Sequence, residues 1–168
     1  MYYLFVSSST TADIDLLALE QQVCFALAIT NRAVLSIYRP LLEPLGLTHP
    51  QYLVMLVLWD HQKESSDGDA PLTVKQIAAS LQLDSATLSP MLKRLEALGL
   101  IARNRNAADE RCTHIELTDD GRVLRDRALE IPPAVVARLG VDLAELDDLR
   151  RRLTRINSAA LAAGGINI

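Results

Sequence analysis

The chain has 168 residues, of which 49% are hydrophobic and 23% are charged, and its formal net charge is −4. This length suits one domain with a hydrophobic core, and the acidic balance argues against a protein that coats nucleic acid indiscriminately. No apolar run approaches the ~18 residues of a membrane span, and the N-terminus lacks the basic segment of a signal peptide. We therefore expect a cytoplasmic protein with no membrane partner and with two reduced cysteines.

The first half of the chain predicts two helices and a loop. Residues 1–12 are expected to form a flexible N-terminus. From residue 13 to 38, apolar residues recur every three or four positions, as on one helix face, and Pro40 is expected to end this helix. Pro50 suits the first turn of a second helix over 50–61, whose apolar character predicts burial. The polar segment 62–71 is interpreted as a mobile loop.

The middle of the chain predicts a helix-turn-helix followed by a hairpin. Thr73 caps a short helix over 73–80, and Asp84 or Ser85 caps a second helix over 84–98, which Gly99 ends in a left-handed conformation. Residues 100–117 then suggest two strands around a polar tip. This order of elements is typical of a winged helix-turn-helix domain, with residues 84–98 as the recognition helix and 100–117 as the wing.

The remaining sequence predicts two more helices. "TDDG" caps a helix that runs to about Glu130, where "IPP" is expected to stop it, and an amphipathic helix covers 142–163. The expected fold is therefore mainly α. A winged helix-turn-helix domain over 50–129 is joined to a dimerisation domain made of N- and C-terminal helices, residues 13–48 and 130–163.

A basic surface is predicted where this domain would meet DNA. Between residues 93 and 111, five basic residues stand against three acidic ones in an otherwise acidic chain. Short hydroxyl side chains and cations on the second helix can reach bases and phosphates in a major groove, while the hairpin tip lies along the backbone. Asp109 would orient Arg111 toward a minor groove. The candidate DNA-binding residues are Ser85, Thr87, Ser89, Lys93, Arg94, Arg103, Arg105, Asp109 and Arg111.

Several motifs resemble one known family. "LDSATLSPMLKRLEALGLIARNRNAADER", followed by "LTDDG", resembles the MarR family of dimeric winged-helix repressors. "EQQVCFAL" and "YRPLLEPLGLTHPQYLVMLVLWDH" are similar to its organic-hydroperoxide-sensing branch, OhrR, and the resemblance covers about residues 16–160. It implies a homodimeric repressor on a pseudo-palindromic double-stranded DNA operator. An organic hydroperoxide would oxidise one cysteine to a sulfenic acid, which condenses with a low-molecular-weight thiol or to a sulfenamide, and the operator would be released.

Cys24 is the candidate redox-sensing residue. By itself, a cysteine on an apolar helix is more often a buried hydrophobe, and nothing on its own helix activates it, because Glu20 is negative and the predicted helix start is distant. In OhrR relatives tyrosines of the other subunit assist the thiol, and Tyr38 matches one of them. On one straight helix Cys24 and Tyr38 would lie about 21 Å apart. Two first helices that cross antiparallel near Asn31 would bring them together across a twofold axis.

Two departures from the family concern the same site. His49 stands where a second tyrosine is usual, and Ala28 replaces an aromatic residue. An imidazole can donate a hydrogen bond to a thiolate, and more strongly when protonated, which predicts a pH-dependent thiol; the alternative is a solvent-exposed loop histidine. Tyr52 is a further candidate for the missing hydroxyl. Cys112 is expected to face outward on the wing, with no assigned role.

Three other functions can be compared with redox sensing. A MarR-type repressor could respond to a small phenolic ligand instead of thiol oxidation, in which case a Cys24→Ser variant would still be induced. A thiol peroxidase would require a resolving thiol and a cationic partner, neither of which the sequence shows, so no enzyme is expected. His49, His61, His114 and the cysteines show no metal-ligand spacing, and no cofactor or metal is predicted.

Overall fold

The computed structural model describes residues 15, 17–64, 70–105 and 113–164, the side chain of Arg105 excepted. The predicted flexible segment 1–12 and the tip of the predicted wing lie outside the described residues. The chain divides into two compact units, residues 1–36 and 37–168.

The first unit contains a 3-10 helix, η1 (Leu19–Gln21), and the beginning of α1 (Val23–Leu42). Gln22 between them is extended, with φ −85° and ψ 115°, so it interrupts the helical path and α1 begins at Val23. The prediction of one helix from residue 13 is therefore wrong for the described residues. An apolar period of three to four residues cannot distinguish a continuous helix from a 3-10 turn followed by a new helix.

The second unit begins within α1, which continues through Pro40 to Leu42. The expected break at Pro40 is wrong. Proline removes the hydrogen bond to the carbonyl four residues earlier and crowds that carbonyl, but these costs do not end the helix here, and α1 continues for two residues past the exposed Pro40. A second 3-10 helix, η2 (Glu43–Leu45), follows, and Gly46 adopts φ +71° to turn the chain toward α2 (His49–Glu64).

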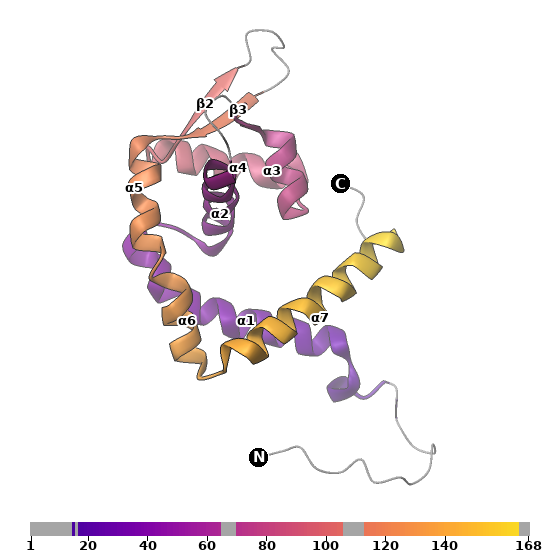
Figure 1. Ribbon diagram of the computed structural model, residues 1–168. Helices are drawn as coiled ribbons and strands as arrows, with labels where there is room; N and C mark the ends of the chain where they lie inside the picture. The colour runs from indigo at the N-terminus through magenta and orange to yellow at the C-terminus, as the bar shows by residue number, and fades with distance from the viewer. Residues whose placement is uncertain (1–14, 16, 65–69, 106–112, 165–168) are drawn as a thin grey trace. The chain divides into compact units, whose positions relative to one another are not determined.

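The core of the second unit lies where α2 packs against α3 (Val74–Leu81) and α4 (Ser85–Ala97), as Figure 1 shows. The predicted burial of α2 is confirmed for one face, on which Val54 and Met55 are fully buried, whereas Leu53 and Leu56 on the other face are 37% and 39% exposed. α2 continues to Glu64, however, so residues 62–64 are helical and the predicted loop 62–71 was too long at its start. The central buried side chains are Val54, Met55, Ile77, Leu88, Leu92 and Leu95.

The predicted helix-turn-helix is confirmed to within one residue at each boundary. Thr73 accepts a hydrogen bond from the Gln76 amide while the Gln76 side chain accepts one from the Thr73 amide, which completes a capping box at the start of α3. Asp84 caps α4 by accepting a 2.6 Å bond from the Thr87 amide. Between the helices Gln82 adopts φ +53°, a left-handed conformation that the sequence did not predict, because glycine or asparagine usually occupies it.

The hairpin of the wing consists of β2 (Ile101–Arg105) and β3 (Thr113–Leu117), paired antiparallel with Ile101 opposite Leu117. A two-residue strand, β1 (Leu72–Thr73), pairs with the other side of β3, which gives the sheet order β1-β3-β2. Two residues carry no alternation pattern, so β1 could not be predicted. In Figure 1 the hairpin projects beyond α3 and α4.

Three helices end the chain: α5 (Asp119–Ala128), α6 (Ile131–Leu139) and α7 (Leu143–Ala162). The cap of α5 at Thr118 and the position of α7 are confirmed. The "IPP" segment ends one helix as expected, but it also begins α6, which the sequence analysis missed. Proline in a first helical turn loses no hydrogen bond, so "IPP" was itself a helix-start signal. The fold is mainly α with a winged helix-turn-helix, as predicted. Among the described helices none has the length and apolar character needed to cross a bilayer.

Candidate functional site

The recognition helix α4 has one buried and one exposed face. Leu88, Leu92 and Leu95 are completely buried. The side chains opposite them are exposed, and among these are the predicted Lys93 and Arg94. The helical period places two further exposed residues, Ala86 and Pro90, directly opposite the leucines. The sequence analysis passed over both because it searched only for polar side chains, although the leucine spacing already placed them on this face.

The hydroxyl groups of α4 are partly engaged within the helix. Thr87 Oγ1 donates to Asp84 Oδ2 at 2.9 Å, and Ser89 Oγ donates to the Ser85 carbonyl at 2.6 Å. Ser89 is also half-buried, whereas the sequence analysis expected it to face outward. These hydroxyls keep acceptor capacity, but their protons are committed to the cap and to the helix backbone.

Four charged residues of the wing are candidates for DNA binding, and the structure describes the backbone of two of them, Arg103 and Arg105. Arg103 is half-buried on β2, and its Nη1 lies 3.9 Å from Glu96 Oε2 of the recognition helix. Arg105 is the last residue of β2, and its side chain lies outside the described residues. Asp109, Arg111 and Cys112 also lie outside the described residues, so their predicted roles stay predictions.

Cys24 is exposed and is the second residue of α1. This corrects the expectation that the helix start is too distant to influence it. The first helical hydrogen bond joins the Ala26 amide to the Gln22 carbonyl at 3.1 Å, so the amides of residues 23–25 precede the hydrogen-bonded ladder. Free amides at a helix start favour negative charge nearby, and Glu20, one turn earlier, opposes it.

The three candidate partners of the thiol come together in the second unit. The Tyr38 and His49 rings meet edge to face with centroids 4.9 Å apart, and the Tyr52 ring centroid lies 6.2 Å from that of Tyr38. Tyr52 in turn meets Trp59 at 6.4 Å. Tyr38 and His49 are half-buried and Tyr52 is buried, so His49 is not a solvent-exposed loop residue: it is the first residue of α2.

Burial sets the protonation of this aromatic cluster, which we define as Tyr38, His49 and Tyr52. It raises the pKa of Tyr38 above 10.0, and burial together with the proximity of Tyr38 raises the pKa of Tyr52. Burial lowers the pKa of His49 below 6.5. At neutral pH the cluster therefore offers two phenol hydroxyls and a neutral imidazole, and the expected protonated His49 requires more acidic solution.

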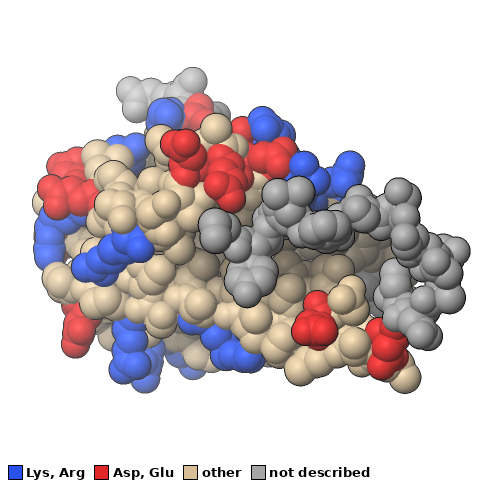
Figure 2. Space-filling view, turned by 90° about the horizontal axis from the view of Figure 1, so that it is seen from below, with Lys and Arg blue, Asp and Glu red and all other residues tan. Residues whose placement is uncertain are grey.

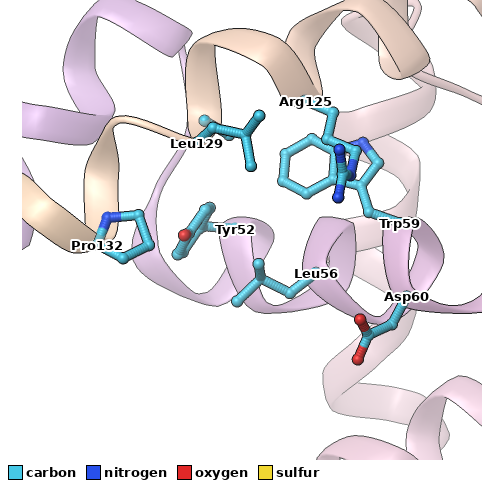
Figure 3. Close-up of a pocket in the computed structure, with 8 residues that line it drawn as sticks. Tyr52, Leu56, Trp59, Asp60, Arg125, Leu129 and Pro132 are labelled. Atoms are coloured by element: carbon cyan, nitrogen blue, oxygen red, sulfur yellow. The ribbon is translucent and has the colours of Figure 1, made fainter. Parts of the chain in front are cut away.

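A hollow opens beside the aromatic cluster, between α2, α5 and α6 (Figure 3). Its volume is about 110 Å³. Tyr52 and Pro132 lie at one end, and Asp60 and Arg125 lie at the other. Most of the wall between them is apolar. The lining residues are Tyr52, Leu56, Trp59, Asp60, Arg125, Ala128, Leu129 and Pro132.

Each unit also exposes apolar side chains that a monomer would leave in water. In the first unit Val23 is 63% exposed and Leu27 42%. In the second unit one face of α7 exposes Leu149, Leu153 and Ile156 by 38–47%. In Figure 2, stretches of surface without lysine, arginine, aspartate or glutamate lie between the charged side chains wherever grey atoms do not cover them. Such surface is typical of an interface between protein chains.

Among the described residues, no group of three or more histidine, cysteine, aspartate or glutamate side chains could hold a metal ion. The prediction that the site has no metal therefore stays an expectation for the whole chain.

Comparison with known proteins places these features in context. The family model described as "Transcriptional regulator SarA/Rot" matches residues 36–128. The organic hydroperoxide resistance transcriptional regulator of Bacillus subtilis (strain 168) is 43% identical over 137 residues, which is 82% of this chain and 86% of that protein.

Solved structures agree with the fold. A structure of reduced AbfR bound to DNA has a TM-score of 0.71 and 31% identity, and it covers 86% of this chain and 94% of that one. A structure of overoxidised AbfR bound to DNA has a TM-score of 0.61 and 33% identity, and it covers 82% of this chain and 95% of that one. AbfR comes from Staphylococcus epidermidis.

Proposed function

The chain belongs to the MarR family of winged helix-turn-helix transcriptional regulators, and we propose that it is a DNA-binding repressor that releases its operator when an organic hydroperoxide oxidises Cys24. One observation carries the proposal: an exposed cysteine lies in the first turn of α1, in a chain that is 43% identical to an organic hydroperoxide resistance regulator. The DNA-bound and oxidised forms of AbfR support the combination of DNA binding with redox chemistry.

The active form is a homodimer. The exposed leucines of α7 and the exposed apolar residues before and within α1 supply the surface that a second copy would cover. In the dimer, two α4 helices enter successive major grooves of a pseudo-palindromic operator about one helical turn apart. Residues 13–48 and 130–163 form the dimerisation domain, and residues 50–129 form the DNA-binding domain.

Oxidation begins with the Cys24 thiolate. Its sulfur attacks the outer oxygen of the hydroperoxide, the O–O bond breaks, and the leaving alkoxide takes up a proton and departs as an alcohol. Cys24 becomes a sulfenic acid. A low-molecular-weight thiol then displaces water to form a mixed disulfide, or a backbone nitrogen does so to form a sulfenamide.

The aromatic cluster of the partner subunit assists this step. Its phenols stay protonated at neutral pH, because burial raises both tyrosine pKa values, so they can donate hydrogen bonds to the thiolate and to the leaving oxygen. His49 does the same as a neutral imidazole. The modified sulfur no longer fits these donors, the helices repack, and the spacing between the two α4 helices changes.

The decisive experiment is a gel shift with an operator that the reduced protein selects from random DNA duplexes. We expect reduced protein to bind, protein treated with one equivalent of cumene hydroperoxide and a small thiol to lose at least tenfold in affinity, and Cys24→Ser to bind under both conditions. Val123→Ser, at an exposed position of α5 with no assigned role, is the matched control and should respond like the unchanged protein. Release of the Cys24→Ser variant by the hydroperoxide would refute redox sensing at this residue.

A second candidate function is induction by a small organic ligand. The hollow in Figure 3 favours it, because a concave surface lined mostly by apolar side chains, with a few polar groups at its ends, is typical of a site for a small organic ligand. Cys24→Ser separates the two functions, since a repressor of this kind would still be induced by its ligand. Catalytic turnover of hydroperoxide with a reductant would instead indicate a peroxidase.

A further inference from the structure

The outermost surface of the recognition helix α4 is apolar. Ala86 and Pro90 are exposed and stand four residues apart, so their side chains are neighbours on the helix surface, directly opposite the buried Leu88 and Leu92. Lys93 and Arg94 flank them. When the buried face of a recognition helix packs on its domain, the opposite face enters the groove. The part of α4 that would lie deepest in the major groove therefore carries the apolar side chains of Ala86 and Pro90.

The neighbouring hydroxyls are poorly placed to read bases as donors. The Thr87 hydroxyl donates to Asp84, and that of Ser89 donates to the carbonyl of Ser85. Ser85 is exposed at the start of α4, so base readout by hydrogen-bond donation from this helix is left largely to Ser85, Lys93 and Arg94. Apolar contact is the other means of direct readout in a major groove, and the C5-methyl group of thymine is the partner that the groove offers.

Pro90 does not contribute to the buried core of the domain. It lies inside α4, where proline removes the amide that would bond to the Ala86 carbonyl and crowds that carbonyl. Its ring is exposed, so core packing does not compensate. The ring instead adds apolar surface to the exposed helix face that also carries Ala86.

We propose that Ala86 and Pro90 form one apolar contact surface that recognises thymine methyl groups in each half-site of the operator. The inference rests on the proposed DNA-binding function and assigns it a base preference. Lys93 and Arg94 hold the helix in the groove through phosphates and neighbouring bases, and the apolar surface selects thymine over cytosine and uracil at the contacted positions.

The test uses the full-length reduced protein and its selected operator. Each thymine is replaced in turn by deoxyuridine, which removes only the methyl group, and binding is measured at one fixed salt concentration. We expect at least one thymine per half-site at which replacement weakens binding about fourfold, the factor that corresponds to the burial of one methyl group. The double variant Ala86→Ser, Pro90→Ser should reduce this factor to less than twofold.

The matched control is Val123→Ser, an exposed apolar position of α5 that lies outside α4 and outside the proposed dimerisation segments. It should keep the full deoxyuridine effect. Thermal unfolding separates recognition from folding, because removal of Pro90 should stabilise α4 and raise the unfolding midpoint while the thymine preference is lost. If the double variant binds too weakly for the deoxyuridine effect to be measured, the single variant Pro90→Ser is measured in its place.

The inference is overturned if no thymine responds to deoxyuridine, or if the α4 variant keeps a factor of two or more. Either result leaves the proposed function intact as long as the reduced protein binds DNA and hydroperoxide releases it. Failure to select any operator would instead count against the proposed function itself.

Discussion

The Tyr38 ring meets the His49 ring edge to face, at 4.9 Å between centroids and an interplanar angle of 72°. The contact joins the C-terminal part of α1 to the first residue of α2, and both side chains are half-buried. The surroundings of these rings determine the protonation state of His49. The pKa of His49 falls because its charged form loses solvent, so the imidazole is neutral at the pH at which the thiol would react.

This contact predicts a pH dependence of stability. The unfolded chain protonates His49 near pH 6.5, whereas the folded chain does so only at lower pH. The unfolded state therefore binds more protons in this window, and the free energy of unfolding should decrease as the pH falls below about 6.5. Urea unfolding at pH 7.5 and 5.5 measures the decrease, which should be smaller in His49→Phe than in the unchanged protein. An equal decrease in both proteins would show that other groups cause it.

The same variant tests the role of His49 toward the thiol. If the imidazole of the partner subunit donates to Cys24, His49→Phe should slow alkylation of Cys24 by iodoacetamide at neutral pH severalfold. Leu53→Phe, an exposed position one turn further along α2, is the control. Unchanged alkylation in His49→Phe would remove His49 from the set of thiol partners.

The cap of the recognition helix predicts a selective loss of DNA binding. The pKa of Asp84 is lowered from 3.8 mainly by the hydrogen bond from the Thr87 amide, so the cap stays ionised at all pH values where the protein would be studied. Asp84→Ala should fray the first turn of α4 and weaken operator binding severalfold, whereas Asp84→Asn should keep most of the affinity, because asparagine also caps helices. Equal affinity of Asp84→Ala and the unchanged protein would mean that this turn does not contribute to binding.

Substitution of Gly121 is expected to destabilise the fold. A methyl group added there would collide with the backbone oxygen of Leu100 at the base of the wing, and the Gly121 carbonyl accepts a 2.9 Å bond from the buried Trp59 indole. Gly121→Ala should lower the free energy of unfolding by about 1–3 kcal/mol, as overpacking does. Chemical denaturation followed by the fluorescence of Trp59 measures it, and the exposed Asp120→Ala should change stability far less.

The leucine face of α7 predicts the oligomeric state. Glutamate at both Leu149 and Leu153 should turn a homodimer into monomers, because two charges would be buried in the interface, and operator affinity should fall by more than tenfold as one half-site is lost. Analytical ultracentrifugation measures the mass. Arg155→Glu, on another face of the helix, is the control. If the double variant remained dimeric, the dimer interface would have to lie elsewhere than on this face of α7.

The fold was predictable wherever local signals were strong. The caps at Thr73, Asp84 and Thr118 and the left-handed Gly99 gave boundaries that the structure confirms, because a cap depends on atoms only a few residues apart. β1 and the left-handed Gln82 were not predictable. The first exists only through pairing with β3, and the second is a left-handed C-cap of α3 at a residue that is neither glycine nor asparagine.

By itself the sequence determined the winged helix-turn-helix, its family, and the choice of Cys24, Tyr38, His49 and Tyr52 as candidates. Tertiary structure decided what these residues can do. The interruption at Gln22 puts Cys24 in the first turn of a helix, and packing of α1 against α2 brings the three ring side chains together. Motif and period depend on short-range covalent geometry, whereas burial, and with it protonation and accessibility, arises only when distant segments exclude water from one another.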